Sequence, residues 1–148
     1  MTDILYDIAI IGSGPIGSAT AYFLAQKAKN QKIILITEDP TDERTSTYHF
    51  AGGSVQYSHW AEPEKTVMTS TTAKFVKELA EKGVDLSLIE DGYLFLDDGV
   101  WADSLNISGL KLVNYFIEEI KKSEVEVKGN TSVDQVKKDG ETYKITAG

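Results

Sequence analysis

The sequence has 148 residues, of which 41% are hydrophobic and 26% are charged, the composition of one ordinary globular domain. Its formal net charge of -8 argues against general nucleic-acid binding, and no run approaches the ~20 apolar residues of a membrane helix. With no cysteine, the sequence provides no disulfide, thiolate metal site or cysteine nucleophile.

The first part of the sequence predicts a strand, a helix and a second strand. Residues 4–11 form an Ile-rich apolar run that is typical of a buried parallel strand, and residues 33–37 form another. Between them, apolar residues recur near helical spacing from Pro15 to about Lys29. A strand–helix–strand unit of this kind predicts parallel pairing with a right-handed crossover.

The middle of the sequence predicts a loop, a helix and a hairpin. Residues 39–61 are polar and punctuated by glycine, which indicates a loop. A helix is expected over residues 63–82, with a proline at its start and a glycine after its end. Residues 85–89 and 93–96 flank Glu90-Asp91-Gly92 and are typical of a short hairpin.

The last part of the sequence predicts one more helix and short strands. Ser108 is expected to cap a helix that runs to about Lys122. Residues 125–129 and the segments around Asp139-Gly140 are expected to form strands. Together the elements predict an α/β fold: one Rossmann-type domain over residues 1–148, with a parallel sheet, helices on both faces and a small antiparallel insertion.

Three glycines at the spacing G-x-G-x-x-G separate the first strand from the first helix. Gly12 allows a tight turn, Gly14 lets backbone N–H groups approach a pyrophosphate, and Gly17 lets the helix pack closely on the sheet. Phosphates at such a turn lie at a helix N-terminus, here formed by Pro15 and Ile16. The alternative interpretation is a glycine turn that only packs a helix.

An acidic residue follows the second strand, as the dinucleotide motif requires. Glu38 lies 21 residues after Gly17, near the ~20 that the motif expects, where a carboxylate accepts hydrogen bonds from the adenosine ribose. Asp39 is the neighbouring candidate, and a solvated carboxylate is the alternative interpretation. An acid here disfavours the 2′-phosphate of NADP, whereas NAD and FAD both fit.

The loop after that strand distinguishes between these two cofactors. Residues 46–53 read STYHFAGG, and with YDIAIIGSGPIGSATAYFLA, ILITE and DGYLFL they occur in the order seen in a known family. On these stretches the sequence resembles the flavin-dependent amine and amino-acid oxidoreductases of the D-amino-acid oxidase superfamily. That superfamily includes sarcosine oxidase, glycine oxidase and the dimethylglycine and sarcosine dehydrogenases. The resemblance covers nearly all of the sequence and implies FAD as the cofactor.

The resemblance also implies further FAD-binding residues. The backbone at Ala51, Gly52 and Gly53 would pass close to the flavin ring. Arg44 and Ser46 would reach phosphate or ring oxygens from the same loop. A further backbone contact is expected near Val133, on the adenine side of the cofactor.

Three other residues have two interpretations each. His49 aligns with a histidine that bonds covalently to the flavin in the dimethylglycine and sarcosine dehydrogenase branch, and its alternative is plain hydrogen bonding to flavin or phosphate. His59 and Trp60 would lie by the flavin ring, or be a solvated histidine and a core tryptophan.

For the activity, the resemblance implies oxidation of a C–N bond in a small amine or amino-acid substrate. Relatives carry a longer substrate-binding sheet, so no catalytic residue is assigned here. The alternatives are a non-catalytic FAD- or nucleotide-binding subunit and half of an NAD-dependent dehydrogenase.

Assembly and location are expectations of a different kind. An incomplete sheet leaves an uncovered edge, so we expect a homo-oligomer or a partner subunit. The first residues lack the basic flank and cleavage site of a signal peptide, and we expect a cytoplasmic protein.

Overall fold

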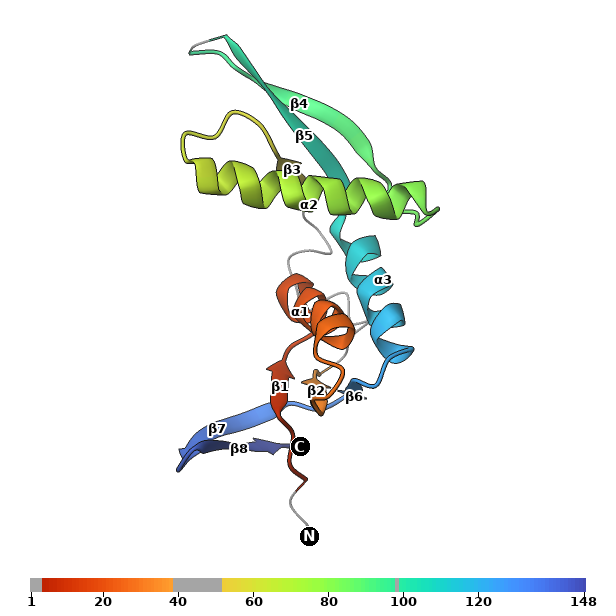
Figure 1. Ribbon diagram of the computed structural model, residues 1–148, viewed down its shortest axis with the longest axis vertical. Helices are drawn as coiled ribbons and strands as arrows, with labels where there is room; N and C mark the ends of the chain where they lie inside the picture. Colours follow the sequence, from red (N-terminus) through yellow and green to blue (C-terminus); the bar gives the residue numbers. More distant parts are fainter. Residues whose placement is uncertain (1–3, 39–51, 98) are drawn as a thin grey trace. The chain divides into compact units, whose positions relative to one another are not determined.

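The computed structural model describes residues 4–38, 52–97 and 99–148. The chain divides into two compact units, Met1–Ser46 with Val113–Gly148, and Thr47–Leu112 (Figure 1). Each unit contains a three-stranded sheet of its own. The expectation of one domain over residues 1–148 stays a prediction.

The first unit contains a three-stranded parallel sheet. Strands β1 (Ile8–Ile11), β2 (Ile33–Ile36) and β6 (Glu126–Lys128) lie in the order β1-β2-β6. Helix α1 (Pro15–Lys27) connects the first two strands. All four residues of β2 are buried, because β2 is the central strand and its apolar run meets protein on both faces. The predicted strand–helix–strand unit with parallel pairing is confirmed.

Helix α3 (Gly109–Lys121) contacts α1 through aromatic rings. The ring of Tyr22 lies 4.9 Å from that of Phe116 and 5.8 Å from that of Tyr115, measured between centroids. Burial and the hydrogen bond with Tyr22 raise the pKa of Tyr115 far above its ordinary value. The predicted cap is confirmed, since the backbone N–H of Lys111 donates to Ser108 Oγ over 3.3 Å.

A two-stranded hairpin completes the first unit. Strands β7 (Val133–Asp139) and β8 (Thr142–Ala147) pair antiparallel around Gly140, whose φ of +60° suits a tight turn. At the open end of the hairpin, Ser132 and Gly148 exchange backbone hydrogen bonds of 3.0 and 3.1 Å. The predicted pair of strands around Asp139-Gly140 is confirmed.

The second unit is the antiparallel insertion. Strands β3 (Gly52–Gln56), β5 (Val100–Ser108) and β4 (Ile89–Phe95) lie in the order β3-β5-β4. Helix α2 (Pro63–Glu81) packs against β3 and buries Ala73, Val76 and Leu79. Its bounds confirm the predicted helix. The α/β class, the Rossmann-type parallel sheet and the antiparallel insertion therefore stand as predicted.

Helix α2 carries a run of hydroxyl residues, Thr69 to Thr72, in its middle. The hydroxyls of Thr69, Thr71 and Thr72 each donate to the carbonyl four residues earlier, over 2.8, 2.7 and 3.0 Å. Such residues favour the helix weakly, because their side chains compete for backbone groups. The helix therefore depends on its buried face for stability.

Two predictions for the second unit are wrong. Part of the expected loop, residues 52–56, forms β3, because its glycines pack against β5: a Cβ on Gly53 would lie 3.1 Å from the Ile107 carbonyl oxygen. The expected hairpin around residues 90–92 is one continuous strand, β4. Gly92 lies under the ring of Trp101, where a Cβ would come within 2.2 Å of the ring, so this glycine serves packing instead of a turn.

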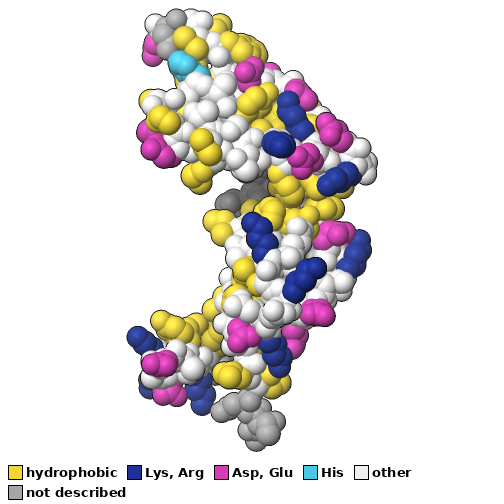
Figure 2. Space-filling model, viewed as in Figure 1, with side chains coloured by type: hydrophobic (Ala, Val, Ile, Leu, Met, Phe, Trp, Pro, Cys, Tyr) yellow, Lys and Arg dark blue, Asp and Glu magenta, His cyan; other side chains and the backbone are white. Residues whose placement is uncertain are grey.

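The surface mixes charges and apolar side chains. Figure 2 shows acidic and basic side chains interspersed over the visible face, with hydrophobic side chains between them. Several large apolar side chains on and beside β4 are exposed, among them Ile89, Leu94 and Leu96. Among the described residues, no helix is both long and apolar enough to cross a membrane.

Candidate functional site

The turn between β1 and α1 has the backbone geometry that its glycines predict. Gly12 has a φ of +89°, a left-handed conformation in which a side chain is strained. A Cβ on Gly17 would lie 1.9 Å from the carbonyl oxygen of Gly12, so only glycine lets α1 approach the turn this closely. Pro15 stands in the first turn of the helix, where a missing N–H costs no helical hydrogen bond.

The start of α1 is open to a ligand. No side chain caps the helix at Gly14, so its first N–H groups have no partner from a capping side chain. A Cβ on Gly14 would meet no atom within 4 Å, which means that the backbone borders open space. Ile16 beside it is 84% exposed. Free N–H groups, the helix dipole and an unobstructed backbone fit the pyrophosphate of a dinucleotide.

A hydrogen bond between two hydroxyl groups connects this turn to the end of β2. Ser13 and Thr37 are buried, and their hydroxyl oxygens lie 2.8 Å apart. The backbone N–H of Gly12 also donates to the Ile36 carbonyl over 2.8 Å. Glu38 follows directly, is exposed, and projects from the same edge of the sheet. The carboxyl ends of parallel strands form the edge at which such sheets bind ligands.

The segment after β6 reaches the same edge. The backbone N–H of Thr37 donates to Lys128, and that of Thr131 donates to Thr37, each over 3.0 Å. Ser132 follows, and its hydroxyl donates to Glu38 Oε1 over 3.0 Å. Ser13, Thr37 and Ser132 were not among the residues predicted for this site. The available signal was a hydroxyl residue at the end of each predicted parallel strand or shortly after it.

The structure brings together part of the predicted site. The residues at the carboxyl edge of the β1-β2-β6 sheet are Gly12, Gly14, Pro15, Ile16, Gly17 and Glu38. Val133 begins β7 next to Ser132, in the same unit, whereas Gly52 and Gly53 belong to β3 in the other unit. The remaining predicted residues, Asp39, Arg44, Ser46, His49 and Ala51, lie outside the described residues.

The grouped residues fit the adenosine diphosphate half of FAD. The helix start suits its two phosphates and Glu38 suits its ribose hydroxyls, by the donor and acceptor chemistry that each needs. Within the described part of the chain, no three His, Asp or Glu side chains are placed to hold a metal ion.

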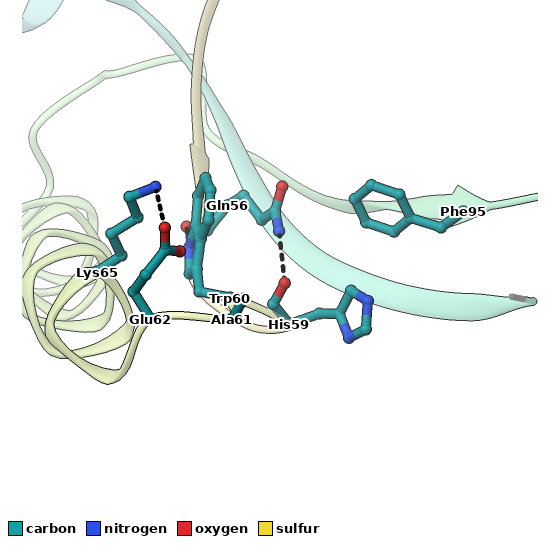
Figure 3. A pocket seen from close by; sticks show the side chains of 7 residues that line it. All are labelled: Gln56, His59, Trp60, Ala61, Glu62, Lys65 and Phe95. Atoms are coloured by element: carbon teal, nitrogen blue, oxygen red, sulfur yellow. Dashed lines mark hydrogen bonds and ion pairs between the residues drawn. The ribbon is translucent and has the colours of Figure 1, made fainter. Parts of the chain in front are cut away.

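The second unit contains a separate open pocket of about 480 Å³ (Figure 3). Its lining residues are Gln56, His59, Trp60, Ala61, Glu62, Lys65 and Phe95. The Trp60 indole N–H donates to the Gln56 carbonyl over 3.0 Å, and the Gln56 amide donates to the His59 carbonyl over 3.4 Å. His59 has a φ of +57°, and its ring lies 5.2 Å from that of Phe95.

One side of this pocket carries an ion pair. Lys65 Nζ lies 2.9 Å from Glu62 Oε1, and this hydrogen bond holds the pKa of Glu62 below its ordinary value. The pocket has the size of small-molecule sites. His59, which is exposed, and Trp60, which is half-buried, both line this pocket.

Two curated relatives share part of this sequence. FAD-dependent oxidoreductase domain-containing protein 1 of Xenopus laevis is 33% identical over 100 residues, which cover 61% of this chain and 20% of that protein. Its homolog in Drosophila melanogaster is 30% identical over 106 residues, covering 69% of this chain and 20% of that protein. The chain thus spans about a fifth of the length of these relatives.

Solved structures share the fold. Glycine oxidase from Geobacillus kaustophilus superposes with a TM-score of 0.69 at 15% identity, covering 96% of this chain and 51% of that one. NikD, described as an unusual amino acid oxidase essential for nikkomycin biosynthesis, superposes with a TM-score of 0.66 at 12% identity, covering 96% and 47%. The family model described as FAD dependent oxidoreductase (DAO) matches residues 7–106, and the chain belongs to this family.

Proposed function

We propose that this chain is the FAD-binding portion of an oxidoreductase that oxidises a C–N bond of a small amine or amino acid. The observation that carries the proposal is the carboxyl edge of the β1-β2-β6 sheet, where the open start of α1 and Glu38 lie together. Family membership supports FAD as the dinucleotide. The likeness in fold to glycine oxidase and to an amino acid oxidase supports the substrate class.

Each part of this edge has a proposed role. The first N–H groups of α1 bind the pyrophosphate, and the Glu38 carboxylate accepts hydrogen bonds from the ribose. When bound, FAD supplies the capacity to accept a hydride equivalent from the carbon beside the substrate nitrogen. Gly52 and Gly53 are proposed to let the backbone of β3 pass close to the flavin ring.

His49 is proposed to attach the flavin covalently: its imidazole nitrogen would bond to the flavin 8α-methyl carbon, a C–H bond there would break with loss of a proton, and dioxygen would accept the electron pair left on the flavin. The support is its position in the STYHFAGG segment, together with the nucleophilic character of a neutral imidazole. Acid precipitation of the FAD-loaded protein tests this proposal. Flavin absorbance in the pellet, lost in His49→Ala, is the expected result, and complete release into the supernatant contradicts it.

A partner subunit or second copy is proposed to cover β4. Strand β4 is an edge of the β3-β5-β4 sheet, and Ile89, Leu94 and Phe95 on it are exposed. Exposed edge strands with apolar side chains favour pairing with another strand. If a second copy covers β4, light scattering after size-exclusion chromatography is expected to give more than one chain per particle, and a monomer would contradict the second copy.

Titration of the purified chain with FAD tests the proposed function. We expect flavin fluorescence to be quenched in proportion to the bound fraction, and weaker binding in Glu38→Gln. Glu124→Gln is the matched control, because Glu124 is another exposed glutamate and lies outside the site. Failure of the wild-type chain to bind FAD would contradict the proposal.

The alternative is a non-catalytic FAD-binding subunit. The observation that favours it is that the residues grouped at the sheet edge, the start of α1 and Glu38, have proposed roles in cofactor binding only. Anaerobic addition of glycine, sarcosine and other small amines to the FAD-loaded protein distinguishes the two. Bleaching of the flavin absorbance supports the oxidoreductase, and stable colour with every compound supports the subunit.

A further inference from the structure

The carboxylate of Glu38 is held from a distant part of the chain. Ser132 Oγ donates to Glu38 Oε1 over 3.0 Å, although 94 positions separate the two residues in sequence. Glu38 is exposed at the end of β2, where an unsupported side chain would sample several rotamers. A hydrogen bond from a fixed donor reduces that freedom before any ligand arrives.

The backbone of Ser132 is itself fixed on both sides. Asn130 has a φ of +51°, a left-handed conformation that asparagine tolerates, at the turn after β6. Thr131 then donates its N–H to the Thr37 carbonyl over 3.0 Å and is buried. Ser132 and Gly148 exchange two backbone hydrogen bonds at the base of the β7-β8 hairpin. The donor that faces Glu38 therefore belongs to a segment that backbone hydrogen bonds hold on both sides.

The two oxygens of the Glu38 carboxylate differ in their hydrogen-bond partners. A carboxylate is an acceptor at both oxygens, and Ser132 occupies Oε1, which leaves Oε2 without a partner in the hydrogen bonds of the described residues. The free oxygen can accept a hydrogen bond from a ribose hydroxyl. Ordering the acceptor in advance lowers the entropic cost of that contact.

We propose that Ser132 is a positioning residue for nucleotide recognition, which orients Glu38 toward the ribose hydroxyls of the bound dinucleotide. The inference rests on the proposed function, because it assumes that Glu38 binds the ribose. It assigns to the β7-β8 hairpin, whose base holds Ser132, a part in the affinity for the adenosine half of FAD.

Calorimetric titration with ADP and with 2′-deoxy-ADP tests the proposal. The wild-type chain is expected to bind ADP more tightly, because only ADP offers the 2′-hydroxyl. In Ser132→Ala this preference is expected to shrink by about 3- to 10-fold, the range of one hydrogen bond. Ser132→Thr restores the hydroxyl and is expected to recover most of the preference.

A matched control separates positioning from folding. Ser70→Ala removes another exposed serine hydroxyl, which donates to a backbone carbonyl in α2 away from the sheet edge. It is expected to leave both affinities unchanged. Thermal unfolding of Ser132→Ala is expected to match that of the wild type, because Ser132 Oγ is exposed.

The outcomes distinguish the two hypotheses. A wild-type preference for ADP that persists in Ser132→Ala overturns the role of Ser132 and leaves the proposed function intact. An equal loss of affinity for both nucleotides, with a lower unfolding temperature, shows a purely structural residue and also overturns the role. A wild-type chain that binds neither ADP nor FAD overturns the proposed function and the inference together.

Discussion

Ser13 and Thr37 share a buried hydrogen bond, with 2.8 Å between their hydroxyl oxygens, and each residue is only 6% exposed. The bond joins the glycine turn to the strand end that carries Glu38. Thr37→Val leaves the Ser13 hydroxyl buried without this partner, and we expect a loss of about 1–3 kcal/mol of unfolding free energy. Urea denaturation measures it.

The double variant checks the cause. Adding Ser13→Ala to Thr37→Val removes the orphaned hydroxyl, so the double variant is expected to lose less than the sum of the two single losses. Additive losses would contradict a direct interaction between the two side chains.

Gly14→Ala is expected to impair FAD binding without affecting folding. Gly14 has a φ of -62°, which alanine adopts freely, and a Cβ there would meet no protein atom within 4 Å. The new methyl group would stand where the pyrophosphate approaches the backbone. We expect an unchanged unfolding temperature and at least a tenfold weaker FAD affinity, about 1.4 kcal/mol. Unchanged affinity would place the pyrophosphate elsewhere.

Gly17→Ala is expected to lower the stability of the fold, whereas Gly14→Ala is expected to lower the affinity for FAD. Its Cβ would lie 1.9 Å from the Gly12 carbonyl oxygen, a backbone atom that cannot move without displacing the turn. We expect a loss of roughly 1–3 kcal/mol of unfolding free energy, as for overpacked cores. Circular dichroism during thermal unfolding measures the loss, and a wild-type unfolding temperature would contradict the close approach of α1.

The stability of the second unit is expected to depend on pH through Asp85. Lys111 Nζ and the backbone N–H of Ser87 donate to its carboxylate over 2.5 and 3.0 Å and hold the pKa of Asp85 below its ordinary value. Because the folded pKa is depressed, the stabilisation is present above the unfolded pKa of about 3.9 and is lost as the pH falls through the folded value. NMR titration of the Asp85 carboxyl measures the shift, and Lys111→Met is expected to reduce it. A pKa that stays the same in Lys111→Met would exclude the ion pair as its cause.

Gly92→Ala is expected to move the ring of Trp101. Trp101 is 55% exposed and its ring can shift outward, so we expect a modest stability loss, below about 1 kcal/mol, and a change in tryptophan emission. A Trp60→Phe background isolates the signal of Trp101. Unchanged emission would contradict the packing of Trp101 over Gly92.

Local patterns in the sequence were sufficient to predict the first part of the fold. The apolar run that became β2 is buried at all four positions, and the glycines before α1 adopt the turn that their spacing predicts. Both signals depend on residues close together in the sequence. The glycine turn and Glu38 were predicted as site residues from patterns that are equally local.

Contacts between distant residues set the limit of that prediction. Glu90-Asp91-Gly92 has the composition of a turn, yet β4 continues through it, because an edge strand exposes its charges and Gly92 accommodates Trp101. The turn that joins β4 to β5 includes Gly99, which has a φ of +68° and donates its N–H to the Phe95 carbonyl over 2.8 Å. The contact of Ser132 with Glu38 depends on the pairing of β2 with β6, which no local pattern specifies.

The hydroxyl-rich middle of α2 has a consequence for how the chain folds as it is synthesised. A helix with so many weak helix formers does not persist alone in water. Helix α2 packs against β3. In the described sheet, β3 pairs only with β5. Strand β5 ends at Ser108, after α2 in the chain. Since a nascent chain emerges from its N-terminus, α2 leaves the ribosome without the surface that stabilises it, and it becomes a lasting helix only after β5 has followed.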